Sequence, residues 1–196
     1  LELVTGNFAT IPMAIFDGQC RLPALLKNWS IAFIANLLGS LFFASLYAFY
    51  VTKAGTSYHN VLIEKINEVA FSKTIAYKEM GMTGWLIAFV KAFICNWMVT
   101  FGVVMALAST STIGKIAAIW LPIFTFFALG LEHAVVNMFV LPTAMLFDAP
   151  ITLSDWWFWN QIPVTLGNIA GAFLLTACSL YFGFKKRTSD DTKNNT

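Results

Sequence analysis

Long stretches without a charged residue divide the chain. Three of them, residues 28–52, 92–114 and 156–184, contain 25, 23 and 29 positions. A helix needs about 20 apolar residues to cross the hydrocarbon core of a bilayer, so each stretch is long enough to span it. The sequence lacks the period-two alternation that is typical of a transmembrane β-barrel. The pattern therefore predicts membrane-spanning helices.

Two other apolar stretches are short or interrupted. Residues 116–147 are apolar apart from Glu132 and His133 near their middle, and residues 3–16 form a similar short half after Glu2. Halves of 14 to 16 residues do not cross a bilayer alone, but two halves that meet at a break near the midplane do. We expect a half-helix over about 3–16, helices over 28–52, 84–108 and 159–184, and a broken helix over 114–147.

The remaining segments connect or follow these helices. Residues 53–80 form a polar loop, and apolar positions at helical spacing over 60–79 predict an amphipathic helix at the membrane interface. We expect residues 1–187 to form one transmembrane domain and residues 188–196 to form a disordered tail.

Composition supports an all-α integral membrane protein. Apolar residues make up 58% of the 196 residues and charged residues 11%, against about 25% charged residues in soluble domains. The net charge of +2 is too small for a nucleic-acid footprint. Three cysteines (Cys20, Cys95 and Cys178) form no CxxC pair, so we predict no metal site and no cofactor.

Basic residues indicate the orientation. Lysine and arginine occur in loop 17–27, in turn 108–115 and after residue 184, whereas loop 148–155 carries two aspartates and no base. The long loop 53–80 is an exception, but its four lysines are nearly balanced by three glutamates. Cytoplasmic segments carry the excess of basic residues. We therefore expect a cytoplasmic C-terminus, an external loop 148–155 and a plasma-membrane location.

The chain contains an internal repeat. Residues 1–7 (LELVTGN) resemble residues 131–137 (LEHAVVN), and further identities follow at offsets that increase from 130 to 132. The later identities pair Asn28 with Asn160, Asn36 with Asn168 and Gly39 with Gly171. Two repeats of three spans each have opposite orientation, as in inverted-repeat transporters and channels. The first copy begins at its own LE pair, so we expect roughly 60–80 further residues before residue 1, and no sealed pore from this chain alone.

The residues beside the break are the strongest candidates for chemistry. His133 is an ionisable group within an apolar segment, which predicts a proton donor or an anion contact; the alternative is a neutral histidine bonded to the backbone. Glu132 and Glu2 occupy equivalent positions, where a carboxylate is expected to cap the following half-helix. Asn137 and Asn7 follow the breaks and either bond the unwound backbone or face a pore.

Other candidates depend on their position. Thr5, the repeat partner of Val135, either faces the midplane near His133 or bonds its own helix. Phe126 either packs in the bilayer or forms part of a dry constriction. Lys115 either snorkels to the interface or attracts anions into a vestibule.

Two further features concern the packing of the helices. Lys91 lies inside the predicted span 84–108, and we expect its side chain to snorkel outward. Small residues four positions apart, Ala35 with Gly39 and Gly167 with Gly171, predict faces where helices pack closely.

Several motifs together resemble the formate/nitrite transporter family. They are LELVTGNF at 1–8, CNWMV at 95–99, ASTSTIGK at 108–115, LPIFTFFALGLEHAVVNMFVLP at 121–142 and LGNIAGA at 166–172. The resemblance covers residues 1 to about 184. It implies six spans per complete protomer in an aquaporin-like inverted repeat, a homopentamer in the lipid bilayer, and a pore in each protomer. The implied substrates are small monovalent anions or their conjugate acids, such as nitrite, formate or hydrosulfide.

The resemblance also implies roles for single residues. His133 matches the central pore histidine, Thr5 the threonine that pairs with it, and Asn137 the asparagine below it. Lys115 matches the vestibule lysine. The residues that match the pore constriction are Phe126, Leu3 and Val4.

These observations predict a channel or transporter and not an enzyme. A bare anion pays a heavy desolvation cost in an apolar ring, and His133 or water connected to it would neutralise the anion there. One alternative is an aquaporin-like channel for neutral solutes, but Asn-Pro-Ala caps are absent from the sequence. Another is a membrane enzyme or scaffold, which would need clustered polar catalytic groups.

Overall fold

The computed structural model describes residues 3–58 and 60–183, and this part of the chain contains helices and no strand. The helices are α1 (Val4–Phe16), α2 (Leu22–Val51), α3 (Val61–Lys73), α4 (Ile75–Glu79), α5 (Met82–Ala108), α6 (Thr112–Ala128), α7 (Ala134–Leu146) and a final helix, Leu153–Gly183. The final helix consists of α8 (Leu153–Trp156), η1 (Trp157–Gln161), α9 (Ile162–Gly171), η2 (Ala172–Cys178) and its last turns; η1 and η2 have π-helical hydrogen bonding. Three described helices, α2, α5 and the final one, are long and apolar enough to cross a membrane. The all-α fold is confirmed, whereas Glu2 and the tail 188–196 lie outside the described residues.

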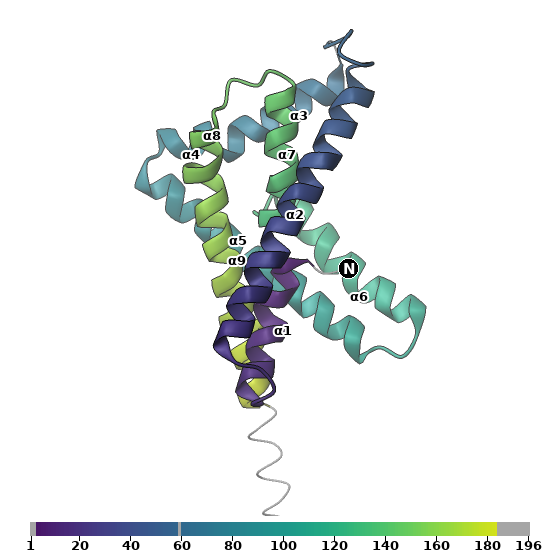
Figure 1. Ribbon diagram of the computed structural model, residues 1–196, viewed down its shortest axis with the longest axis vertical. Helices are drawn as coiled ribbons and strands as arrows, with labels where there is room; N and C mark the ends of the chain where they lie inside the picture. The colour runs from purple at the N-terminus through teal and green to yellow at the C-terminus, as the bar shows by residue number, and fades with distance from the viewer. Residues whose placement is uncertain (1–2, 59, 184–196) are drawn as a thin grey trace, which may run out of the picture.

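The internal repeat is visible as two similar units with opposite directions. Each unit has a half-helix of 13 residues, α1 or α7, followed by a turn and a long helix. In Figure 1, α1 runs from the middle of the molecule to its lower end, and α7 runs from the middle to the upper end. The long helix of each unit then runs back past the middle. The predicted inverted orientation is therefore present in the fold.

The break between α6 and α7 has a local cause. Gly130 has a φ of 59°, the left-handed conformation in which α-helices often terminate, and the Leu131 N–H then closes onto the carbonyl of Phe126 at 3.0 Å. His133 is extended, with φ −124° and ψ 121°, and α7 begins at the next residue. Three residues therefore separate the C-cap Leu129 from the N-cap His133, and Glu132 and His133 lie between the two half-helices.

The predicted helix bounds needed correction at two starts. The helix expected at 28–52 begins at Leu22. The charged residue Lys27 lies inside the helix and does not limit it, and Pro23 is tolerated because it lies in the first turn. The helix expected at 159–184 begins at Leu153, where Thr152 and Asp155 form a reciprocal capping box. The amphipathic segment 60–79 is divided into α3 and α4.

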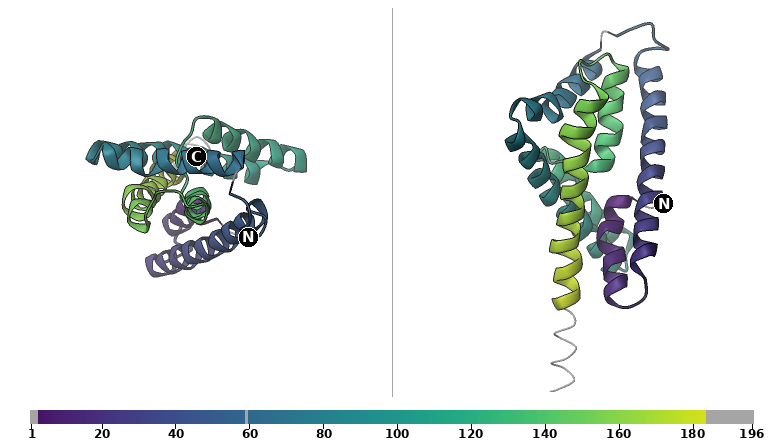
Figure 2. Two further views of the ribbon diagram at one scale, coloured as in Figure 1. Left: turned by 90° about the horizontal axis from the view of Figure 1, so that it is seen from above. Right: turned by 60° about the vertical axis from the view of Figure 1, so that its left-hand side comes forward.

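The predicted grouping of the basic segments agrees with the arrangement of the turns. The turn from α1 to α2, the turn from α5 to α6 and the end of the final helix lie toward the lower end in Figure 1. The loop from α7 to α8 and helix α3 lie at the upper end, and the turned view of Figure 2 agrees. Loop 17–27 and turn 108–115 therefore share one side of the molecule, whereas segment 53–80, with four lysines and three glutamates, lies at the other end.

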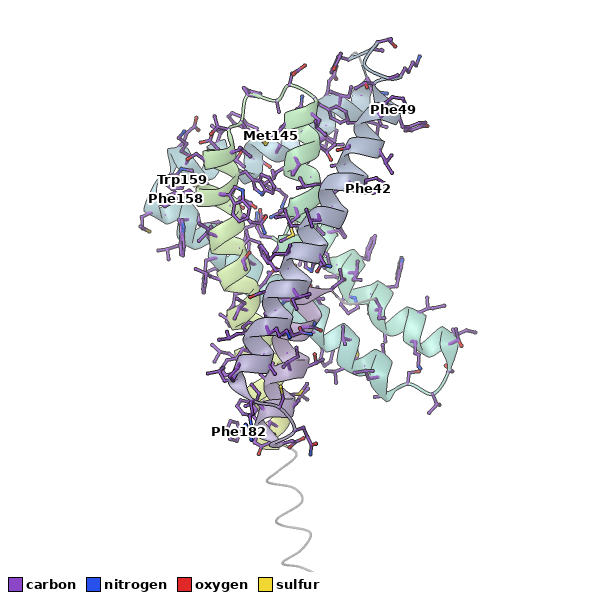
Figure 3. The ribbon with its side chains drawn as sticks, in the orientation of Figure 1. Phe42, Phe49, Met145, Phe158, Trp159 and Phe182 are labelled. Atoms are coloured by element: carbon purple, nitrogen blue, oxygen red, sulfur yellow. The ribbon has the colours of Figure 1, made fainter. Side chains whose placement is uncertain are left out.

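Large apolar side chains cover the outside of the helices. Phe42 and Phe49 on α2 are 68% and 66% exposed and point away from the neighbouring helices in Figure 3. Phe158 and Phe182 on the final helix are also exposed. A surface of this kind is suited to lipid and not to water.

Close packing joins α5 to the final helix. A Cβ on Gly167 would meet the backbone carbonyl of Phe89, and one on Gly171 would meet that of Phe93. The close contact predicted from Gly167 and Gly171 is therefore confirmed. In the first repeat, by contrast, a Cβ on Gly39 would meet no atom within 4 Å.

We predict that Gly171→Ala destabilises the protein, whereas Gly39→Ala does not. The added methyl group at residue 171 forces α5 away from the final helix, and overpacking of this kind costs about 1–3 kcal/mol. Thermal unfolding of the two purified variants in detergent, followed by tryptophan fluorescence, measures the difference. Equal midpoints for both variants would show that the α5 contact tolerates a side chain.

Candidate functional site

Asparagine side chains from the long helices cap both half-helices. The first N–H groups of a helix have no partner within the helix. The Ala134 N–H at the start of α7 donates to Asn168 Oδ1 at 2.8 Å. In the other repeat, the Val4 N–H at the start of α1 donates to Asn36 Oδ1 at 2.9 Å. The two hydrogen bonds join equivalent residues of the two repeats, so both half-helices are capped in the same way.

A second pair of equivalent amide contacts lies one turn further along each half-helix. Asn7 Nδ2 donates to Asn28 Oδ1 at 2.8 Å, and Asn137 Nδ2 donates to Asn160 Oδ1 at 2.8 Å. The asparagines predicted to bond backbone or face a pore therefore bond to partners in the long helices. The repeat identities at Asn28 and Asn160 are explained by these contacts.

Two buried asparagines connect the break to α5. Asn168 Nδ2 donates to the carbonyls of Ala92 at 2.8 Å and Glu132 at 3.1 Å. Asn96 Nδ2 donates to the carbonyls of Thr5 at 3.0 Å and Asn168 at 2.8 Å. Because both asparagines are fully buried, these bonds satisfy backbone groups that water does not reach.

The carboxylate of Glu132 lies at the centre of a buried polar cluster. It is 1% exposed and forms an ion pair with Lys73 Nζ at 2.8 Å. Tyr77 OH donates to Oε1 at 2.8 Å, and Asn137 Nδ2 and Asn160 Nδ2 donate to Oε2 at 2.7 and 3.3 Å. The prediction that Glu132 caps α7 is wrong, because its carboxylate is bound by these side chains.

Lys73 and Tyr77 were missed by the sequence analysis. Both lie in the amphipathic segment, where charged residues are expected to be solvated, and the partner Glu132 is 59 residues from Lys73. The one available signal was that a carboxylate at membrane depth requires a cation. Burial, together with the neighbouring Glu132 carboxylate, raises the pKa of Tyr77, so its phenol stays protonated and acts as the donor.

His133 itself caps α7. Its Nδ1 accepts a hydrogen bond from the Val136 N–H at 3.3 Å. From this bond we assign the proton of the neutral imidazole to Nε2, and this N–H has no hydrogen-bond partner in the part of the chain that the structure describes. The ring stacks on Phe126, with centroids 5.6 Å apart and planes 15° apart, and is 5% exposed. The arrangement combines a single donor with an aromatic wall.

The other predicted site residues differ in their surroundings. Thr5 is fully buried, and its hydroxyl has no hydrogen-bond partner within the described part of the chain, so it does not bond its own helix there. Val4 is fully buried in an apolar cluster with Phe8 and Ala32, and Leu3 is half exposed. The structure thus gives Val4 a packing role.

The two candidate lysines of the spanning helices are placed differently. Lys115 is exposed in the first turn of α6, on the side of the molecule that holds the other basic turns. Lys91 does not snorkel outward as predicted. Its Nζ lies 3.4 Å from Tyr77 OH and 5.9 Å from the centre of the Tyr77 ring.

The described residues offer no metal cluster near this region. In residues 3–58 and 60–183, no three His, Cys, Asp or Glu side chains are placed to hold a metal ion. An open groove of about 340 Å³ between α1, α2 and α9 is lined mainly by apolar residues such as Phe8, Trp29 and Phe33. The groove does not include His133, so the polar chemistry is concentrated at the break.

Comparison with known proteins gives consistent matches. A sequence profile described as "Formate/nitrite transporter" matches residues 1–182. A probable formate transporter of Methanothermobacter thermautotrophicus is 36% identical over 94% of this chain and 69% of its own length. A formate channel of Bacillus thuringiensis is 28% identical over 96% of this chain and 68% of its own. The chain thus spans about two thirds of the length of these relatives.

Solved structures resemble the chain in fold. One described as an ion channel of the FNT family has a TM-score of 0.80 and 27% identity, and covers 93% of this chain and 69% of its own. A pentameric formate channel with formate bound has a TM-score of 0.66 at 23% identity, over 82% of this chain and 67% of its own. The second likeness concerns the fold alone.

We predict that Lys73→Met strongly destabilises the protein, because it leaves the Glu132 carboxylate buried without a cation. Removing one partner of a buried ion pair costs about 3–5 kcal/mol. The double variant Lys73→Met/Glu132→Gln removes the unpaired charge and should recover part of this loss in thermal unfolding.

The matched control for this prediction is Lys65→Met. Lys65 pairs with Glu68 at 2.7 Å, but the two side chains are 65% and 70% exposed. An exposed pair of this kind contributes about 0–1 kcal/mol, so the control should unfold near the parental midpoint. A Lys73→Met protein as stable as this control would contradict the importance of the buried ion pair.

Proposed function

The chain belongs to the formate/nitrite transporter family, and from that premise we propose that it carries small monovalent anions, or their conjugate acids, past His133. The observation that carries the proposal is the Nε2–H of the buried His133, which has no hydrogen-bond partner within residues 3–58 and 60–183 and lies at a break between two apolar half-helices. An ionisable group at membrane depth is costly and is retained for a function. We place the protein in the bilayer as a transport protein and not as an enzyme.

Neutralisation of the anion is the physical core of the proposed mechanism. Phe126 and neighbouring apolar side chains make the path dry, and a bare anion is expensive to transfer into such surroundings. The Nε2–H of His133 donates a hydrogen bond to the anion, and a proton reaches the anion directly or through connected water. The neutral acid then passes the apolar ring and ionises again beyond it.

The capping bond of His133 argues for the route through water. Protonation of the imidazole at Nδ1 removes the acceptor for the Val136 N–H, and loss of a helix cap costs about 1 kcal/mol. A neutral imidazole that gives up its only proton becomes an imidazolate, which is a far poorer state near pH 7. In our proposal His133 therefore orients the anion and the proton donor rather than cycling through its own charged form.

The remaining pathway residues have auxiliary roles in this proposal. Thr5 offers a buried hydroxyl without a described partner, and Asn137 holds Glu132 beside the path. Lys115 attracts anions into a vestibule on the basic side. The constriction consists of Phe126 with Leu3, while Val4 packs in the apolar cluster that contains Phe8 and Ala32.

The substrate class and assembly follow the relatives. The relatives named above are described as a formate transporter and a formate channel, and one structural neighbour is a pentamer with formate bound. We propose formate or nitrite as the substrate class and a homopentamer in the plasma membrane as the assembly.

We predict that His133→Phe nearly abolishes anion flux without unfolding the protein. The phenyl ring keeps the apolar volume but removes the N–H donor. His133→Asn keeps an N–H donor and should pass anions with the parental pH dependence, because in our proposal the imidazole stays neutral throughout. Thr5→Val should reduce flux less, because it removes one hydroxyl and leaves the imidazole. Formate uptake into proteoliposomes made with the full-length protein measures all three. Parental rate and pH profile in His133→Phe would refute the proposed mechanism.

We also predict that the α7–α8 loop is external and that the C-terminus and the α1–α2 turn are cytoplasmic. Ser154 is exposed in this region, whereas Asp155 is 3% exposed, so Ser154→Cys is the suitable labelling site. A membrane-impermeant maleimide should label this cysteine on intact cells, and should label the native Cys20 in the α1–α2 turn only after permeabilisation. The reverse pattern would invert the orientation, and Cys20→Ser controls for background.

A further inference from the structure

Lys91 is a charged residue within a helix long enough to span the membrane. It is the tenth residue of α5, more than two turns from the start of the helix. Its ammonium group donates to Tyr77 OH at 3.4 Å and lies 5.9 Å from the centre of the Tyr77 ring. A lysine that only snorkels would extend its ammonium group to the interface, so this inward contact requires another explanation.

Tyr77 connects Lys91 to the site beside His133. Its oxygen accepts from Lys91, while its O–H donates to Glu132 Oε1 at 2.8 Å. A cation on the acceptor side of a hydroxyl polarises it and strengthens the hydrogen bond that it donates. Tyr77 is 4% exposed, so little water screens this chain of contacts.

The charges along this chain of contacts do not balance. Glu132 carries one negative charge and is paired directly with Lys73, and Lys91 adds a second positive charge through Tyr77. Asp155, the other buried carboxylate of the described residues, is occupied by Lys78 at 2.8 Å. One positive charge in excess therefore remains next to the residue that precedes His133.

We propose that Lys91 and Tyr77 determine the affinity for the anion: Lys91 supplies the excess positive charge, and Tyr77 is the positioning residue that transmits it to Glu132. This inference rests on the proposed function, because it assigns the counter-charge for the anion in that same path. It places an affinity determinant in α4 and α5, away from the vestibule lysine. A monovalent anion balances the excess charge, whereas a neutral solute does not.

The test is a double-mutant cycle on formate uptake by proteoliposomes of the full-length protein, measured against formate concentration. Lys91→Met should raise the half-saturating concentration about three- to tenfold, the range expected for one charge that acts across a few hydrogen-bond lengths in a protein. Its maximal rate should change less than twofold, because the lost interaction serves capture of the anion. Lys91→Arg, which keeps the charge, should return the half-saturating concentration to within about twofold of parental.

The second arm of the cycle tests the role of Tyr77. Tyr77→Phe keeps the ring and should raise the half-saturating concentration in the same direction, so the measurement does not depend on Lys91→Met folding. The double variant should be no worse than the worse single variant, because the two residues act as one unit. Lys53→Met, at an exposed lysine of the α2–α3 loop, is the matched control and should match the parental protein.

The possible outcomes separate this inference from the function on which it rests. The inference is overturned if Lys91→Met or Tyr77→Phe has the parental half-saturating concentration, or if their effects are additive in the double variant. In either case, uptake that still depends on His133 leaves the proposed function standing. Absence of formate and nitrite uptake by the parental protein overturns both. An elevated half-saturation in both single variants, with rescue by Lys91→Arg and no additivity, supports the inference.

Discussion

The fold depends on hydrogen-bond partners for the backbone N–H groups at the two points where a helix starts inside the bilayer. A half-helix that begins at the midplane exposes N–H groups where water is scarce, and each unsatisfied group costs several kcal/mol. Asn36 and Asn168 meet this requirement from the neighbouring long helices, with bonds of 2.9 and 2.8 Å. Because Asn168 also holds carbonyls of Ala92 and Glu132, one amide fixes the break relative to two long helices.

The position of the chemistry follows from this arrangement. The break places Glu132 and His133 on consecutive residues with different surroundings. Glu132 is bound by four donors from α3, α4, α7 and η1. His133 uses one ring nitrogen to cap its own helix, and the other has no partner among the described residues. The carboxylate thus connects the peripheral helices to the break.

The sequence predicted features that follow from local patterns along the chain, and it did not predict contacts between residues far apart in the sequence. Span length, the interruption at Glu132 and His133 and the repeat are one-dimensional patterns, and the structure contains all three. The ion pair between Lys73 and Glu132 joins residues 59 positions apart, and no periodicity encodes that distance. Lys91 was misplaced for the same reason: whether a lysine turns inward depends on a partner, here Tyr77, that only the folded chain supplies. The start at Leu153 was readable, because Thr152 and Asp155 have capping-box spacing.

The π-helical turn η1 accounts for a difference in length between the two halves. Asn28 is the seventh residue of α2, but its counterpart Asn160 is the eighth residue of the final helix, and both still reach the half-helix asparagine at 2.8 Å. The additional residue is accommodated by η1, the wider turn that contains Asn160. An insertion in one copy was therefore absorbed by loosening the backbone winding, while the side-chain contact was kept. The number of residues per turn of the helix therefore changed more readily than the contact between the two asparagines. An alignment of the two halves needs a one-residue gap at η1, because without it the wrong residues are paired from there onward.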